Sequence, residues 1–276
     1  MRKTVLITGT SSGLGKTAAK HFAASGWNVV ATMRTPSAET ELAAAADVLV
    51  TRLDVQDPES IERAIAAGVA RFGRIDALVN NAGFGLFGLF EATPRAKVLE
   101  QFEVNLFGVM DVTRAILPHF RQNKGGTIIN VGSGAGVFGL PMMSLYCASK
   151  FALEGFSESL SYELASHDVA VKIVEPGGVV STNFGKRSGA EAAGNAALAG
   201  YEPFVARTNA VFAGLRASRS ATEEDVARVI FAAATDGTDR LRYVATEDIK
   251  PWVKARRETS EAEYMAFMKA QLVPRS

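Results

Sequence analysis

Short runs of β-branched and other apolar residues alternate with longer helical patterns along almost the whole chain of 276 residues. The runs predict seven strands, at residues 5–8, 28–32, 48–54, 77–80, 127–132, 170–175 and 242–245. Helical patterns lie between them, at residues 14–25, 58–72, 94–121, 144–166 and 223–235. Such alternation is typical of a parallel sheet covered by helices on both faces. The sequence therefore predicts an α/β fold with a doubly wound, mostly parallel sheet.

No internal repeat, charge run or Ser/Pro-rich linker interrupts this pattern, so we expect a single domain over residues 1–271. Asp57 before Pro58, and Thr222 with Asp225 three residues on, are helix-capping signals. Residues 181–219 would lie beside the ligand crevice of such a sheet. We interpret them as a substrate lid, and the alternative is an ordinary surface insertion with one or two helices. The last five residues, 272–276, resemble a protease-site remnant.

Charge and cysteine content exclude several classes of function. The net charge is +1, so no excess of either sign indicates nucleic acid or an anionic membrane as a partner. The single cysteine, Cys147, excludes an intramolecular disulfide and fits a reducing compartment. The first residues reach a glycine turn after very few apolar residues, so we do not expect them to be a signal peptide, and no apolar run is long enough to span a bilayer. We therefore expect a cytoplasmic protein. We also expect no metal site, because His21, His119 and His167 lack ligand spacing and cysteine partners.

A glycine-rich turn directly follows the first predicted strand and opens into a helix. Glycines let the backbone turn sharply and approach a phosphate, while the start of a helix offers free amides and a partial positive charge. The spacing differs from the common Gly-x-Gly-x-x-Gly fingerprint, so the strand before and the helix after are what indicate a diphosphate site. The residues assigned to this site are Gly9, Ser11, Ser12, Gly13, Leu14 and Gly15.

Tyr146 and Lys150 lie four residues apart in a predicted helix, so the phenol and the ammonium project from one face. A free tyrosine has a pKa of about 10, which must fall to about 7 if the phenolate is to act as a base near neutrality. A nearby cation acts in that direction. Ser133, after the strand at 127–132, would donate a hydrogen bond to charge that develops on a substrate oxygen. The three residues predict a site for proton transfer. The alternative for Ser133 is that it is a simple turn serine.

These features together resemble the short-chain dehydrogenase/reductase family. The glycine turn, the Asn-Asn-Ala-Gly segment at 80–83, Asn105, Ser133 and the Tyr146–Lys150 pair occur in the family's order and approximate spacing. The resemblance covers residues from about 4 to 182 and implies a Rossmann-like seven-stranded sheet with a nicotinamide dinucleotide cofactor. It also implies that Lys150 binds the ribose and that Asn105 holds a water linking the lysine to solvent. A helix kink or cap is the alternative role for Asn105.

The resemblance implies further cofactor contacts, of which Asp54 would accept from the adenine amino group unless it is a plain turn aspartate. The family often places a threonine five residues after the proline at 176, but this chain has Ser181 there and Thr182 next. Either hydroxyl could contact the nicotinamide. The implied contacts outside the glycine turn are Asp54, Val55, Asn81, Ala82, Gly83, Tyr146, Lys150, Pro176, Gly177, Val179, Ser181 and Thr182.

The end of the second predicted strand bears on the choice between NAD and NADP. A carboxylate there would bind the ribose hydroxyl of NAD and repel a 2′-phosphate, but residues 31–34 contain no acid. Arg34 offers a planar guanidinium to phosphate oxygens, and the alternative is a solvated turn residue. We therefore predict NADP, with NAD as the alternative.

Apolar side chains gather in the segments that should surround the nicotinamide, and this favours a hydrophobic alcohol, ketone or aldehyde over a sugar. Many of these side chains could instead be core. Within the family, the similarity leans toward steroid-, retinol- or aromatic-carbonyl-type enzymes. The alternatives are a catalytically silent dinucleotide-binding regulator and an acyl-thioester ketoreductase. The predicted pocket residues are Phe84, Phe87, Phe138, Leu140, Met143 and Phe184.

The resemblance also implies assembly, because family members commonly pair through the two long helices that correspond here to residues 94–121 and 144–166. Opposite Tyr146, the second helix carries apolar side chains that need another neighbour. We expect a homodimer or homotetramer. The alternative is a monomer in which the tail at 249–271 covers this surface. The side chains concerned are Phe151, Leu153, Phe156 and Leu160.

Overall fold

Seven parallel strands form one sheet in the computed structural model, which describes residues 2–180 and 198–273. The strand order is β3-β2-β1-β4-β5-β6-β7. Because the order reverses between β1 and β4, a crevice is expected at the carboxyl ends of these strands. The predicted doubly wound sheet is confirmed. The strands are β1 (Thr4–Thr8), β2 (Asn28–Met33), β3 (Val48–Arg52), β4 (Ala77–Asn80), β5 (Gly126–Val131), β6 (Val169–Glu175) and β7 (Arg242–Val244).

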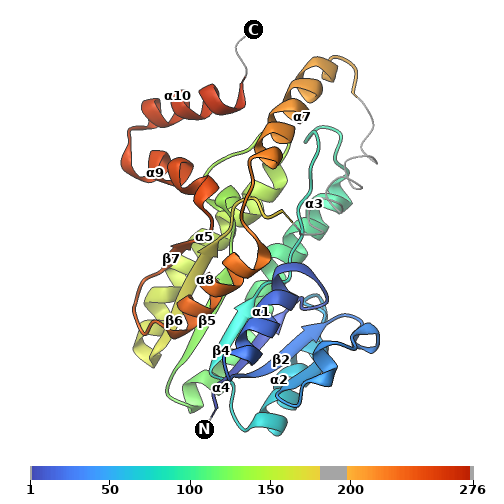
Figure 1. Ribbon diagram of the computed structural model, residues 1–276, viewed down its shortest axis with the longest axis vertical. Helices are drawn as coiled ribbons and strands as arrows, with labels where there is room; N and C mark the ends of the chain where they lie inside the picture. Colours follow the sequence, from blue (N-terminus) through green and yellow to red (C-terminus); the bar gives the residue numbers. More distant parts are fainter. Residues whose placement is uncertain (1, 181–197, 274–276) are drawn as a thin grey trace.

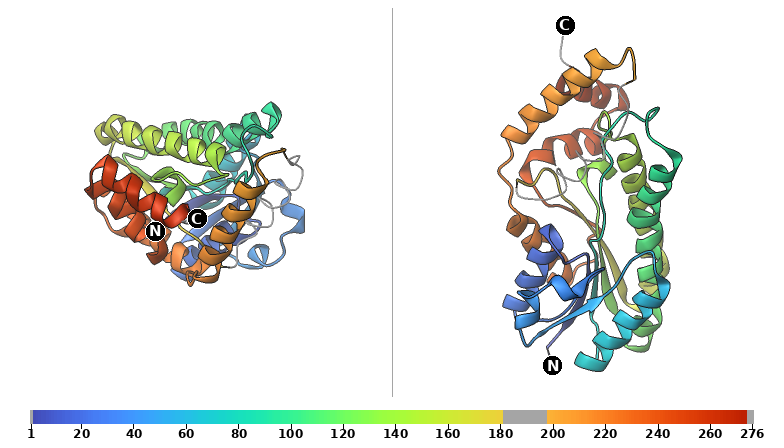
Figure 2. Two further views of the ribbon diagram at one scale, coloured as in Figure 1. Left: turned by 90° about the horizontal axis from the view of Figure 1, so that it is seen from above. Right: turned by 90° about the vertical axis from the view of Figure 1, so that its right-hand side faces the viewer.

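Helices cover both faces of the sheet (Figures 1 and 2). Alternate residues of β1 show why its sequence is apolar throughout: Val5 and Ile7 pack toward α1 and α8, and Leu6 packs toward α2, α4 and α5. A parallel strand buried on both faces needs no polar side. The helices on one face are α1 (Gly13–Ala24) and α8 (Glu223–Thr235); those on the other are α2 (Pro58–Phe72), α4 (Gly108–Gln122) and α5 (Ser144–Leu164).

Two predicted helix starts are confirmed by their caps. The Asp57 carboxylate accepts a hydrogen bond from the Ser60 amide at 3.1 Å, at the start of α2. Thr222 and Asp225 form a reciprocal capping box at the start of α8. Both caps satisfy backbone amides that a helix leaves without an internal partner. Shorter 3₁₀ turns occur at Pro36–Ala38, Leu42–Ala44, Gly134–Gly136, Ala165–His167 and Glu247–Ile249.

The helix predicted over residues 94–121 is not continuous, which corrects the sequence interpretation. It consists of α3 (Arg95–Phe102), a π-helical turn (Glu103–Phe107) and α4. Asn105 lies in this π turn, and its side chain bonds the backbone of Phe84 in a separate segment. A π turn inserts an extra residue into a helix and often occurs at functional sites. The 3.6-residue pattern alone does not reveal such an insertion.

The carboxyl-terminal part of the chain folds into helices above the carboxyl ends of the strands (Figure 1). Residues predicted only as a tail form α9 (Lys250–Glu258) and α10 (Glu261–Leu272), and the lid region contributes α7 (Glu202–Ala217). Trp252, Tyr264 and Met268 pack around Phe138. These helices leave Phe151 on α5 exposed, so they do not form the cover that the monomer alternative required. Among the described helices, none is both long and apolar enough to cross a membrane.

Candidate active site

The glycine turn between β1 and α1 is closely packed, which explains two of its glycines. Gly9 has a φ of 72°, a region that L side chains rarely adopt, and a Cβ on it would lie 2.9 Å from the Cα of Ala82. A Cβ on Gly15 would lie 2.3 Å from the Gly9 carbonyl oxygen. The Asn81 amide donates to the carbonyl oxygens of Thr8 and Gly9 at 2.9 and 3.1 Å. Asn81 therefore holds the turn from the neighbouring strand β4.

The amino terminus of α1 fits a diphosphate. Ser12 is the N-cap residue, yet its side chain makes no capping hydrogen bond, and the first turn contains no acidic residue. Among the described residues, no capping side chain is therefore bonded to the first amides of the helix, and the helix dipole favours an anion there. A Cβ on Gly13 would have no neighbour closer than a Glu223 oxygen at 3.9 Å, so there is room for a ligand.

Beyond the turn, the structure places Arg34 at the exposed end of β2. One acid, Glu39, lies nearby in the chain and is buried in the loop after β2. Its carboxylate binds Lys16 Nζ at 3.0 Å and accepts from the Leu42 amide, and these contacts hold its pKa below the usual range. Glu39 is therefore already paired. Asp54 forms a turn bond, with Oδ1 accepting from the Gln56 amide at 3.1 Å, so its adenine contact stays a prediction.

Ser133, Tyr146 and Lys150 come together at the carboxyl end of β5. Tyr146 and Lys150 lie on α5, and Ser133 lies in the loop after β5, where its hydroxyl bonds the Tyr146 phenol. Lys150 Nζ lies 5.9 Å from the centre of the Tyr146 ring and donates to the Val131 carbonyl oxygen at 2.8 Å. The predicted arrangement of phenol, ammonium and hydroxyl is therefore present.

Burial changes the proton affinity of both groups on α5. It raises the pKa of the Tyr146 phenol to about 12, although the hydrogen bond with Ser133 acts to lower it. Burial lowers the pKa of the Lys150 ammonium to about 8, against the opposing effect of the Glu154 carboxylate. The sequence argument expected the phenol's pKa to fall. In the protein alone burial dominates, so a lower value requires added positive charge from a ligand.

Asn105 joins α5 to the segment after β4. Its Oδ1 accepts from the Phe84 amide at 3.0 Å, while Nδ2 donates to the Phe84 carbonyl oxygen at 2.8 Å and to Ser149 Oγ at 3.2 Å. Ser149 Oγ in turn donates to the Tyr146 carbonyl oxygen at 2.8 Å. This network ties the π turn to α5. Asn105 thus lies at an irregular turn of the helix, which agrees with the alternative structural role. Its role in holding a water stays a prediction.

The segment after β6 is held by residues that the sequence analysis missed. Thr246 Oγ1 accepts from the Gly177 amide and the Asp248 carboxylate accepts from the Gly178 amide, both at 2.9 Å. These partners follow β7, about seventy residues later in the chain, so only the β6–β7 pairing brings them here. Val179 is buried beside this segment. The predicted nicotinamide contacts Ser181 and Thr182 and the pocket residue Phe184 lie outside the described residues.

The predicted pocket residues separate into core and lining. Phe84 and Phe138 are each 2% exposed and belong to the core. Leu140 and Met143 pack beside Tyr146 and its neighbour Cys147, so they line the catalytic centre. Phe87 stacks edge-to-face on Phe212 of α7, with 5.4 Å between ring centres. The lid region thus contacts the segment after β4.

A hollow of about 470 Å³ opens beside this lining, and none of its lining residues was in the predicted pocket. Ser144 lies in its wall, two residues before Tyr146. Its aromatic members were visible in the sequence as isolated aromatics, but nothing local placed them together. The lining residues are Gly88, Leu89, Phe90, Glu91, Met142, Ser144, Tyr201 and Phe204.

Known proteins resemble this chain in sequence. A sequence model described as short chain dehydrogenase matches residues 3–193. An uncharacterized oxidoreductase of Schizosaccharomyces pombe is 34% identical over 242 residues, which are 87% of this chain and 99% of that protein. Human retinol dehydrogenase 8 is 38% identical over 193 residues, which are 67% of this chain and 61% of that protein.

Solved structures resemble the fold. A short-chain dehydrogenase of Streptomyces avermitilis has a TM-score of 0.81 and 32% identity, covering 98% of this chain and 97% of its own. A short-chain dehydrogenase/reductase of Burkholderia phymatum in complex with NAD has a TM-score of 0.79 and 26% identity, covering 100% and 98%. ElxO with NADP bound has a TM-score of 0.73 and 26% identity, covering 89% and 98%. The similar structures therefore include one complex with NAD and one with NADP.

Proposed function

The chain belongs to the short-chain dehydrogenase family and is an NAD(P)-dependent oxidoreductase, and from this premise we propose that it transfers a hydride between NADP(H) and a hydrophobic alcohol, ketone or aldehyde. The observation that carries this proposal is the group of Ser133, Tyr146 and Lys150 at the carboxyl end of β5. A regulator that only bound the dinucleotide would not need a phenol, an ammonium and a hydroxyl in contact.

The nicotinamide, when bound, supplies or accepts the hydride. In the reducing direction Tyr146 gives its phenolic proton to the carbonyl oxygen, and in the oxidising direction its phenolate removes the proton of the alcohol. Ser133 donates a hydrogen bond to the same oxygen as charge develops on it. The Lys150 ammonium, 5.9 Å from the Tyr146 ring, stabilises the phenolate and binds the ribose hydroxyls. Burial of Tyr146 keeps water from competing for the proton.

NADP is favoured over NAD by the charges around the end of β2. Arg34 is exposed there, and its guanidinium can bind a 2′-phosphate through two parallel hydrogen bonds. Glu39, the buried acid in the following loop, is neutralised by Lys16. The site therefore presents a free cation and no free carboxylate at this point among the described residues.

A hydrophobic substrate is supported by the walls beside Tyr146. Leu140 and Met143 contact the catalytic centre, and the hollow beside Ser144 is lined mainly by apolar side chains. An apolar wall near a few polar groups selects a ligand by shape and orients it through its oxygen. Similarity to human retinol dehydrogenase 8 supports the same substrate class.

We also propose a twofold homo-oligomer that forms through α3, the π turn and α5. Leu99 is 47% exposed, Phe107 is 44% exposed, and Phe151 and Tyr162 on α5 are 41% and 73% exposed, whereas Leu153 and Leu160 face the core. Large apolar side chains exposed on neighbouring helices suit an interface between identical subunits. Light scattering at micromolar concentration tests this, and a mass near 29.3 kDa would contradict it. The single buried thiol, Cys147, supports a cytoplasmic location.

The test of function is a panel of hydrophobic ketones, aldehydes and alcohols offered with NADPH and with NADH, or with their oxidised forms. Absorbance at the nicotinamide band reports turnover. We expect turnover of at least one hydrophobic carbonyl, with higher kcat/KM for NADPH than for NADH. Binding of the nucleotide without turnover of any member would instead indicate the catalytically silent regulator.

A further inference from the structure

Two buried carboxylates and two partly exposed arginines form a group behind Tyr146 and Lys150, which we call the charge cluster. Arg242 Nε donates to Glu154 Oε2 at 2.9 Å and lies 3.9 Å from Glu175 Oε1. Arg257 donates to the same oxygen of Glu175. The two carboxylate side chains are only 9% and 0% exposed. The members come from α5, β6, β7 and α9, which meet at one edge of the sheet (Figure 1), and they are Glu154, Glu175, Arg242 and Arg257.

The charge cluster adjoins Lys150. Glu154 follows Lys150 by one helical turn on α5, so both side chains lie on one face. Its carboxylate reaches the end of β5 because Gly132 and Gly136 carry no side chains. A Cβ on Gly132 would lie 3.3 Å from Glu154 Oε1, and a Cβ on Gly136 would lie 3.1 Å from Glu154 Cγ. Val131, next to Gly132, accepts the hydrogen bond of Lys150 Nζ.

One oxygen of this carboxylate is not used by the charge cluster. Within the described residues, Glu154 Oε1 is buried and has no hydrogen-bond partner, whereas Oε2 binds Arg242. A buried carboxylate oxygen without a partner is costly unless a nearby positive charge compensates for it. Lys150, one turn away and itself buried, is such a charge. Glu154 acts on it in the expected sense, since its negative charge raises the pKa of Lys150 against the effect of burial.

We propose that Glu154, held in place by Arg242, is a positioning residue that keeps the Lys150 ammonium charged and directed at the end of β5 beside Tyr146. This inference rests on the proposed function in one respect, the assignment of Lys150 as the cofactor's ribose ligand. The hydrogen bond from Arg257 of α9 to Glu175 also makes α9 part of the support of the active site.

The effect of Glu154 depends on pH, because its own charge does. Burial and the neighbouring Glu175 raise the pKa of Glu154 to about 7, against the lowering effect of Arg242 and Arg257. The other charged group on its own helix near Arg242 is Glu158. Above pH 7 Glu154 is therefore a carboxylate that supports Lys150. Below that pH it is neutral and equivalent to glutamine.

The test measures NADPH affinity by fluorescence titration between pH 6 and pH 9, for the wild type and for Glu154→Gln. We expect equal affinities near pH 6. Toward pH 8 and above, the variant should bind about tenfold more weakly, because loss of the carboxylate lowers the pKa of Lys150 by about one unit. The basic limb of the pH profile, which is its fall at high pH, should move to lower pH by the same amount in kcat/KM for any substrate of the panel.

Two further variants separate positioning from folding. Glu158→Gln also loses a bond to Arg242, but Glu158 is 45% exposed and one turn farther from Lys150, so its profile should follow the wild type. Glu154→Asp keeps the charge at a greater distance and should give a smaller displacement in the same direction. Should thermal unfolding show that Glu154→Gln does not fold, Glu154→Asp decides the matter, and an undisplaced basic limb in that variant overturns the proposal.

An equal loss of affinity at every pH would assign Glu154 a purely structural role, and an equal displacement in Glu158→Gln would assign the effect to Arg242. Either result overturns the proposal. The binding readout is independent of turnover. A panel without any reacting compound therefore contradicts the proposed function, while the pH profile of binding still decides on Glu154.

Discussion

Two buried lysines near opposite ends of the sheet differ in what surrounds them. Lys172 of β6 is 2% exposed, and its Nζ donates to Asp236 Oδ1 and to the Tyr243 hydroxyl, each at 2.9 Å, and also to Thr238. Lys150 of α5 is 6% exposed, and within residues 2–180 and 198–273 its Nζ donates one hydrogen bond, to a backbone carbonyl. Both ammonium groups also lie near a tyrosine ring, at 5.4 Å in the first pair and 5.9 Å in the second.

The comparison shows how partners decide the role of a buried charge. Lys172 is paired with a carboxylate and saturated with oxygen acceptors, so it serves the structure. Lys150 lacks a directly bonded carboxylate, burial lowers its pKa to about 8, and its ammonium can bind ligand oxygens. The same two residue types therefore form a structural pair and the pair for which we propose catalysis in one protein.

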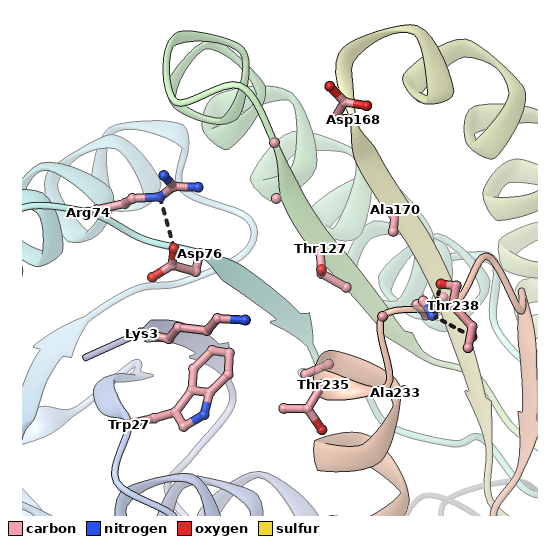
Figure 3. Close-up of a pocket in the computed structure, with 15 residues that line it drawn as sticks. Lys3, Trp27, Arg74, Asp76, Thr127, Asp168, Ala170, Ala233, Thr235 and Thr238 are labelled. Atoms are coloured by element: carbon pink, nitrogen blue, oxygen red, sulfur yellow. Dashed lines mark hydrogen bonds and ion pairs between the residues drawn. The ribbon is translucent and has the colours of Figure 1, made fainter. Parts of the chain in front are cut away.

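The surroundings of the two lysines differ in the same way. A hollow of about 340 Å³ lies at the amino ends of the strands beside Lys172, with Lys3, Trp27, Arg74 and Asp76 along one side (Figure 3). Arg74 and Asp76 in its wall pair with each other at 2.8 Å, and Lys172 pairs with Asp236. At the carboxyl ends, by contrast, Ser12 makes no side-chain cap bond at the start of α1, and Arg34 is exposed without an ion pair among the described contacts.

The largest expected effect separates the two tyrosines. Tyr146→Phe should lower kcat by about 10²- to 10⁴-fold and leave NADPH affinity close to normal, because it removes only the transferable proton. Tyr243→Phe should leave turnover unchanged and cost about 1 to 3 kcal/mol of unfolding free energy, because it removes bonds to Asp236 and Lys172. Steady-state kinetics and urea unfolding of both variants provide the measurement. Activity of Tyr146→Phe within a few-fold of the wild type would break the proposed mechanism.

The two lysines should differ in the same way as the two tyrosines, one in activity and the other in stability. Lys172→Met should destabilise the fold by about 3 kcal/mol, since it leaves Asp236 without its buried partner. Lys150→Met should cost less unfolding free energy, because no carboxylate is bonded directly to Lys150 among the described residues, but should lower both turnover and cofactor affinity, since two roles depend on one ammonium. Paired unfolding and binding measurements check this. A similar loss of stability in both variants would remove the distinction drawn here.

A smaller effect is expected for cofactor choice. Arg34→Ala should weaken NADPH binding by about 1 to 3 kcal/mol and leave NADH binding nearly unchanged, because only NADPH carries the 2′-phosphate. Arg74→Ala, at the opposite end of the sheet, is the matched control and should alter neither affinity. Isothermal titration with both nucleotides decides the point. Equal losses for the two nucleotides would show that Arg34 is structural.

The smallest effect is expected in the acid limb of the stability curve. Burial acts to raise the pKa of Asp236, but hydrogen bonds from Tyr243 and Lys172 outweigh it and hold the pKa below its usual range. The stabilisation is therefore full above the unfolded pKa of about 3.9 and is lost as the pH falls toward the folded value. Asp236→Asn should be less stable than the wild type at pH 7, and the gap should narrow below about pH 4. A gap that stays constant in urea unfolding at pH 3 to 7 would contradict this.

Local patterns in the sequence predicted most of the fold. The strand β4 and the helices α2 and α8 have the predicted bounds, because apolar periodicity, Asp57 before Pro58 and the Thr222 capping box act within a few residues. The prediction over 94–121 was wrong in one respect, since the π turn depends on bonds from Asn105 to a separate segment. The helices α9 and α10 were missed because their faces pack on a distant loop.

The sequence by itself also determined the chemical groups of the site. A four-residue spacing on a helix placed Tyr146 and Lys150 on one face whatever the rest of the chain did. Only the tertiary structure decided what surrounds them, because strand order brings residues far apart in the chain into contact. Arg242 reaches Glu154 across 88 positions, and Thr246 reaches Gly177 across 69. The partners that the tertiary structure places around each ammonium, and not residue type, make Lys150 a candidate for catalysis and Lys172 part of the framework.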